Sequence, residues 1–208
     1  MIRKITFSFL LITALILNSC ASAYMKINPE TINYASKSID KDVLLEYKYD
    51  LLQKKYKKKE TKNEVRLIAV KITNNTEKDI VFGQDVLLTY ENGNELNVIE
   101  TQKLFKTIKQ SPASYLWYLL LSPVQVFSTS SNSSNGGSET RNSFPLGLIL
   151  GPGLAGGNIV AATTANKNFK NELTAFDISG KTITKGQTIY GLIGVNSNTY
   201  DTIKIVMQ

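Results

Sequence analysis

The chain has 208 residues, with 24 Lys and Arg against 17 Asp and Glu, a net charge of +7, one cysteine and no histidine. The absence of histidine excludes Ser-His-Asp and Cys-His catalytic arrangements and, with a single cysteine, the usual zinc ligand sets. One cysteine cannot form an internal disulfide, so the stability of the fold has to come from packing.

Carboxylates alone can hydrolyse glycosides or bind calcium, so acidic clusters need separate consideration. One region holds Asp79, Asp85, Glu91 and Glu95. These residues lack the Asp-x-Asx-x-Asx-Gly pattern of a calcium loop, and no glycine-rich loop leads into the Lys and Ser/Thr of a phosphate-binding loop. We therefore interpret them as solvent-facing strand ends, and predict a protein that is not an enzyme and has no metal and no cofactor.

The first 19 residues have the features of an export signal, because Arg3 and Lys4 precede an uncharged apolar run over residues 5–17. Two processing sites compete at the end of this run. The sequence LNSC, ending at Cys20, resembles the lipobox of bacterial lipoproteins, in which cleavage before the cysteine accompanies acylation of its sulfur. The alternative is ordinary cleavage at Ala21-Ser22-Ala23, which would discard Cys20. We favour the lipobox, because it explains a lone cysteine at this distance.

The lipobox predicts three consecutive segments. Residues 1–19 are the signal peptide, Cys20 is the lipidation site, and residues 20–40, which are polar with little periodicity, form a tether. Two or more acyl chains give stable anchoring, since each buried methylene contributes about 0.8 kcal/mol. The resemblance implies a protein that is lipid-anchored in the bacterial outer membrane, with its periplasmic or surface orientation left open.

Most of the excess positive charge lies in QKKYKKKETK, residues 53–62. One interpretation is a patch for anionic lipid headgroups or an acidic polymer. The favoured alternative is a solvated hairpin end between two strands, whose charges discourage edge pairing. One aromatic residue among the lysines is no stacking platform, so we expect no nucleic-acid partner. The lysines of the predicted patch are Lys54, Lys55, Lys57, Lys58 and Lys59.

Strand patterns follow along residues 41–208, which we expect to form one domain. Residues 64–74 place apolar side chains on both sides and predict a central strand buried on both faces. The turn at Asn92-Gly93 predicts a hairpin. Several short strands with turns at this spacing predict an antiparallel sandwich. The expected strands are residues 42–52, 64–74, 85–90, 95–100, 188–195 and 202–207.

The run VRLIAVKITNNTEKDIVF, with ITKGQTIYGLIGV and TIKIVM later in the chain, resembles immunoglobulin-like β-sandwich domains of bacterial envelope lipoproteins. It is also similar to uncharacterised lipoproteins of the Bacteroidota. The resemblance covers roughly residues 42–100 and 172–208. It implies an accessory or interaction domain and supplies no catalytic residue. The predicted fold class is mainly β: an antiparallel immunoglobulin-like sandwich with an apolar, partly helical insertion.

The insertion is predicted over residues 103–173, because residues 110–138 and 142–166 carry no charged side chain. A Ser/Asn/Gly-rich stretch, residues 128–143, predicts a flexible loop between its two apolar segments. Helical periodicity is clearest over residues 154–173 and weaker over 100–110.

Three interpretations of the insertion remain open. A transmembrane pair is disfavoured, because the first segment is short and broken by Pro123, while the second contains Pro145, Pro152 and several glycines. An interfacial or oligomerising element suits Trp117 and Tyr118, which favour the headgroup boundary, and Gly147 and Gly151, whose spacing lets helices approach closely. The third interpretation is packing against the sandwich. We predict a non-catalytic lipoprotein acting in protein binding or assembly through the insertion, with an envelope protein or a second copy as partner. The alternative is an envelope-polymer or carbohydrate-binding module that uses the lysines and aromatic side chains.

Overall fold

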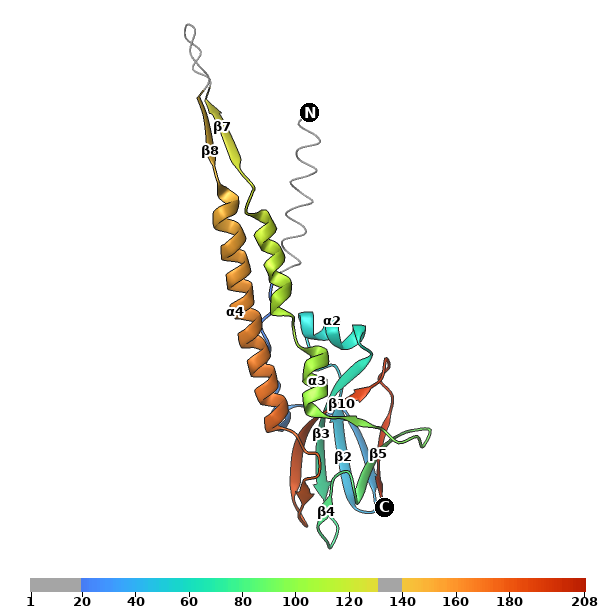
Figure 1. Cartoon of the computed structure of the whole chain (residues 1–208). Helices are drawn as coiled ribbons and strands as arrows, with labels where there is room; N and C mark the ends of the chain where they lie inside the picture. The colour runs from blue at the N-terminus through green and yellow to red at the C-terminus, as the bar shows by residue number, and fades with distance from the viewer. Residues whose placement is uncertain (1–19, 131–139) are drawn as a thin grey trace. The chain divides into compact units, whose positions relative to one another are not determined.

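The computed structural model describes residues 20–130 and 140–208 (Figure 1). The predicted signal peptide and part of the predicted loop, residues 131–139, lie outside the described residues. The chain divides into two compact units. We call the described part of the first, residues 20–23, 111–130 and 140–164, the hairpin unit, and the second, residues 24–110 and 165–208, the β unit.

The β unit is built on a five-stranded antiparallel sheet, and its two longest strands pair in the middle with Val70 opposite Gly191. The strands predicted over residues 42–52, 64–74 and 188–195 are all present in this sheet. In sheet order the strands are β1 (Ser36–Asp40), β2 (Val43–Lys48), β3 (Val65–Asn74), β10 (Thr188–Asn196) and β6 (Val98–Ile99).

Two smaller antiparallel sheets form a second β layer. The first pairs β5 (Val86–Tyr90) with β11 (Ile203–Met207), and the second pairs β4 (Ile80–Val81) with β9 (Thr182–Ile183). Both contribute to one apolar core with the main sheet, in which β3 supplies Ile68, Val70 and Ile72. Burying apolar area of this kind is the main driving force for such a fold.

Helices cover the other side of the main sheet. They are α2 (Lys54–Lys62), α3 (Thr101–Ile108) and residues 165–175 of α4 (Leu146–Ala175). The short η1 (Pro29–Thr31) contacts β3 and β10. A second apolar core joins Leu67 and Ala69 of β3 to Leu104 of α3 and Phe169 of α4. Strand β3 is therefore buried on both faces, as predicted. The mainly β prediction is confirmed only for its antiparallel sheets, because the helices make the fold mixed.

Three segments of the β unit differ from the expectation. The predicted tether is folded from Tyr24 onward, since Ile27 is buried and β1 pairs with β2. The lysine-rich stretch is helix α2 instead of a hairpin end. The turn after β5 forms, with Thr89 opposite Glu95, but the chain then crosses to pair β6 with β10 in the other sheet.

The hairpin unit has two arms. The 3-10 helix η2 (Pro112–Leu121) leads into β7 (Val126–Ser130), and β8 (Thr140–Phe144) leads into α4, of which residues 146–164 belong to this unit. Figure 1 shows η2, in yellow-green, beside the first part of α4, in orange, with β7 and β8 paired beyond them. The hairpin unit spans fewer residues than the predicted insertion, because α3 and the end of α4 pack in the β unit.

Candidate functional site

The hairpin unit carries many exposed apolar side chains on both arms. Trp117, the single tryptophan of the chain, is 72% exposed, and Leu148 and Ile149 of α4 are each 61% exposed. We call this set the apolar surface, and it is the candidate functional site. Its residues are Leu116, Trp117, Leu119, Leu120, Val124, Phe127, Phe144, Leu148, Ile149, Leu150 and Val160.

Inside the hairpin unit, two glycines allow the arms to approach closely. A Cβ atom added at Gly147 would collide with the backbone of Leu121 and Ser122, and one at Gly151 would lie 2.7 Å from the Ser122 Oγ. The predicted small-xxx-small pair thus serves the contact between η2 and α4. Because both glycines are buried, they do not belong to the apolar surface.

The predicted aromatic pair divides between surface and core. Trp117 points out, whereas Tyr118 is only 7% exposed and stacks on Tyr115 with ring centroids 6.4 Å apart. Both tyrosines pack against Ala155 and Ala162 of α4. Large rings on η2 therefore pack against small side chains on α4. The two uncharged segments form one packed pair of helices whose outer side chains are apolar and exposed.

Cys20 lies at the side of the hairpin unit. Its neighbour Ala21 donates its N–H to the Asn158 Oδ1 of α4 at 2.5 Å, and the Asn158 Nδ2 donates to the Leu154 carbonyl at 2.7 Å. Cys20 itself is exposed and lies within electrostatic range of Tyr115. Sequence reasoning missed Asn158; a lone amide side chain within an apolar helical run is the signal that points to it.

A second amide, Asn166, closes the base of the insertion within the β unit. Its Oδ1 accepts from the Gln110 N–H at 2.9 Å and from the Tyr56 hydroxyl at 3.1 Å, and its Nδ2 donates to the Gln110 carbonyl at 2.9 Å. The two chain ends at which the insertion leaves the β unit are thereby held together. We call these three bonds the Asn166 clamp.

The lysines predicted as an anionic-surface patch lie on α2, but their environments differ. Lys57 forms an ion pair with Asp50, lies 3.4 Å from the Glu60 carboxylate, and stands over the Tyr200 ring at 5.1 Å. Burial raises the pKa of Glu60. The hydrogen bond that its carboxylate accepts from the Leu67 N–H at 2.9 Å lowers the pKa, but by less. Lys57 is thus tied into the β unit.

The rest of the patch is only partly open to solvent. Lys54 and Lys58 are exposed, whereas Lys55 and Lys59 are half-buried. The ring of Tyr200 already contacts two cations of the β unit, because the Arg66 guanidinium lies 4.9 Å from its centroid in addition to Lys57. Of the five predicted lysines, Lys54 and Lys58 are therefore the two most open to an anionic partner.

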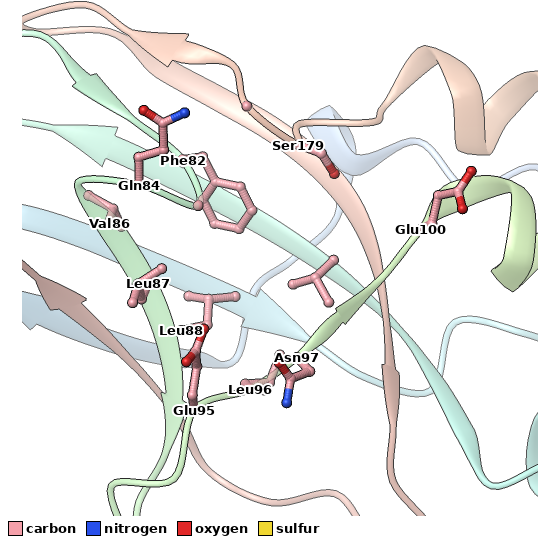
Figure 2. A pocket seen from close by; sticks show the side chains of 13 residues that line it. Phe82, Gln84, Val86, Leu87, Leu88, Glu95, Leu96, Asn97, Glu100 and Ser179 are labelled. Atoms are coloured by element: carbon pink, nitrogen blue, oxygen red, sulfur yellow. The ribbon is translucent and has the colours of Figure 1, made fainter.

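The β unit also has an open hollow of about 480 Å³, shown in Figure 2. Its floor is apolar, with Phe82 and Leu88 almost fully buried, and its rim includes Glu95 and Glu100. Figure 2 shows these two carboxylates well apart, so they do not form the close pair that glycoside hydrolysis uses. Among residues 20–130 and 140–208, no group of His, Cys, Asp and Glu side chains could hold a metal ion.

Comparison of the chain with known protein families, curated proteins and solved structures found no significant match to any of them.

Proposed function

We propose that this chain is a non-catalytic lipoprotein of the bacterial outer membrane, anchored by acyl chains on Cys20, that acts in protein binding or assembly through its hairpin unit. The observation that carries the proposal is the apolar surface. Monomeric soluble proteins rarely expose contiguous apolar patches of more than a few hundred Å², and larger patches mark sites of interaction with proteins or membranes.

The energetics support a contact role. Burying one exposed Leu, Ile or Phe side chain contributes about 1.5–3 kcal/mol, so burying several together can offset the entropy lost on association. Trp117 is the type of large, exposed side chain that dominates binding energy when it becomes buried. The close packing of the arms at Gly147 and Gly151 supports a preformed surface, which lowers the cost of binding.

The β unit would then be the folded module held at the membrane. Its two β layers, with one shared apolar core, support a β-sandwich of the immunoglobulin-like kind as the framework. The helices on the other side of the main sheet are the addition that distinguishes it from a plain sandwich.

The assembly proposal is tested by cross-linking in native membranes. Leu120→Gln and Leu148→Gln each replace an exposed side chain of the apolar surface, and both are expected to remove cross-linked species that the wild type forms. Ile39→Gln is the matched control, because Ile39 is similarly exposed, at 67%, but lies on β1 of the β unit. A wild type that forms no cross-linked species, or loss of the species in all three variants alike, contradicts the proposal.

A further inference from the structure

The apolar surface extends around the arms of the hairpin unit instead of along one stripe. Leu148, Ile149 and Leu150 are consecutive and all exposed, and successive residues of an α-helix point about 100° apart. These three side chains therefore cover more than half of the helix circumference. A helix that is hydrophobic all round belongs in a protein core or in a membrane, whereas a single docked partner needs only one face.

The length and composition of the arms fit a bilayer. Among the described residues, α4 is the one helix long and apolar enough to cross a membrane, and only 22% of its most apolar window is buried. Residues 142–166 carry no charge, and Lys167 and Lys170 follow directly in the sequence. Cations beside an apolar segment are typical of a membrane boundary.

Part of the irregular backbone of the hairpin unit is hydrogen-bonded within the unit, which lowers the cost of placing it in hydrocarbon. Between η2 and β7, the Ser122 and Val124 N–H groups donate to the carbonyls of Leu119 and Leu121, both at 3.0 Å. The Val124 carbonyl accepts from the Gly147 N–H of the other arm at 2.9 Å. Pro123 has no N–H to satisfy. Beyond this turn, β7 and β8 pair with each other along one edge of each strand.

The position of Cys20 indicates how deeply the hairpin unit would enter the bilayer. Ala21 is bonded to Asn158, so acyl chains on Cys20 would leave the protein beside that residue. Leu146, at the start of α4, is twelve residues before Asn158, which at 1.5 Å per residue is about 18 Å along the helix. The hydrocarbon core is about 30 Å thick, so a helix entering at the level of Cys20 passes the midplane.

We propose that the acyl-chain interior of the membrane covers the apolar surface, and that the hairpin unit enters the bilayer beside the lipid carried by Cys20. Insertion of the hairpin unit adds a membrane contact to the proposed function, and it rests on that function only for the acylation of Cys20. The protein then has two membrane attachments. Assembly partners, including other copies of this chain, meet the hairpin unit within the plane of the membrane.

The single tryptophan permits a direct test. The full-length lipoprotein is reconstituted into vesicles of phosphatidylethanolamine and phosphatidylglycerol whose acyl chains carry bromine near the carbonyl end or near the chain middle. Trp117 emission should shift to the blue and be quenched most by the shallow bromine, because Trp117 is two residues from Tyr115, which lies near Cys20. With Trp117→Phe as the background, Leu148→Trp should be quenched most by the mid-chain bromine.

Ile39→Trp in the same Trp117→Phe background is the control and should show no quenching. Quenching at Trp117 and at Leu148→Trp, without quenching at Ile39→Trp, supports entry into the bilayer. If this quenching persists in Cys20→Ala, bilayer entry does not need the lipid. Absence of quenching at both hairpin positions overturns the inference. If those positions instead shift to the blue as protein concentration rises, a second copy covers the surface, and the assembly proposal survives without the membrane insertion.

Discussion

Asn166→Ala is the sharpest perturbation of the β unit, because it removes all three bonds of the Asn166 clamp at once. The side chain is 7% exposed, and its partners, Gln110 and Tyr56, are buried. Removing one partner of a buried hydrogen bond costs about 1–3 kcal/mol, and bonds that share one side chain do not add fully. Alanine recovers roughly 0.6 kcal/mol of helix propensity. The expected loss in unfolding free energy is therefore about 2–5 kcal/mol.

The assay is urea unfolding followed by far-ultraviolet circular dichroism, with Asn168→Ala as the control. Asn168 is the exposed asparagine two residues further along α4, so its replacement should be neutral or slightly stabilising. A native domain has only about 5–15 kcal/mol of stability, which makes the predicted difference readily measurable. If Asn166→Ala costs no more than Asn168→Ala, the clamp does not hold the base of the insertion and the argument is refuted.

Three further substitutions test the packing and electrostatics. Burial raises the pKa of Glu172 from 4.5 to about 7, so between these pH values the folded state holds a proton that the unfolded state has released, and stability falls over this range and levels off above it. In denaturant unfolding, the stability of E172Q relative to wild type should increase by about 1–3 kcal/mol from roughly pH 5 to pH 8. A difference that does not depend on pH would contradict this. Gly194→Val should cost about 1–3 kcal/mol, because a Cβ there collides with the Leu104 side chain; an unchanged urea midpoint would argue against that contact. Gly147→Ala should loosen the hairpin unit and change the tryptophan emission, while Gly153→Ala, with open space around its Cβ, should leave the emission unchanged.

Much of the β unit could be predicted from local sequence. Residues 64–74 alternate apolar side chains on both faces, and the structure buries them on both faces of β3. The late strand over residues 188–195 was predictable for the same reason. Local pattern did not reveal that helices cover one side of the main sheet. Helices α2 and α3 contribute only a few apolar residues each, so their packing against the sheet depends on long-range contacts.

The lysine-rich helix is the clearest case of a tertiary effect. Six lysines in ten residues favour a solvated turn, yet Tyr56 and Glu60, four residues apart, both point into the β unit. Spacing of four residues places two side chains on one helix face. The buried pair therefore selects a helix where composition alone favoured a loop.

The candidate site was predictable in location but not in detail. The absence of charge over residues 110–138 and 142–166 marked the apolar segments, and Trp117 is exposed on them. The glycine pair was recognised as a close-approach motif, but sequence could not tell a contact within the chain from one between chains. The role of Asn158 depends on a residue 137 positions away, which no local pattern encodes.

Membrane fractionation of the wild type beside Cys20→Ala, with each mature N-terminus identified by mass spectrometry, tests whether lipid on Cys20 and the hairpin unit both hold the protein at the membrane. We predict that the wild type begins at an acylated Cys20 and stays with the outer membrane. We further predict that a cleaved Cys20→Ala protein is still held by the hairpin unit and is released only by detergent. A wild type that begins after Ala23, with Cys20 removed, would contradict the lipoprotein assignment.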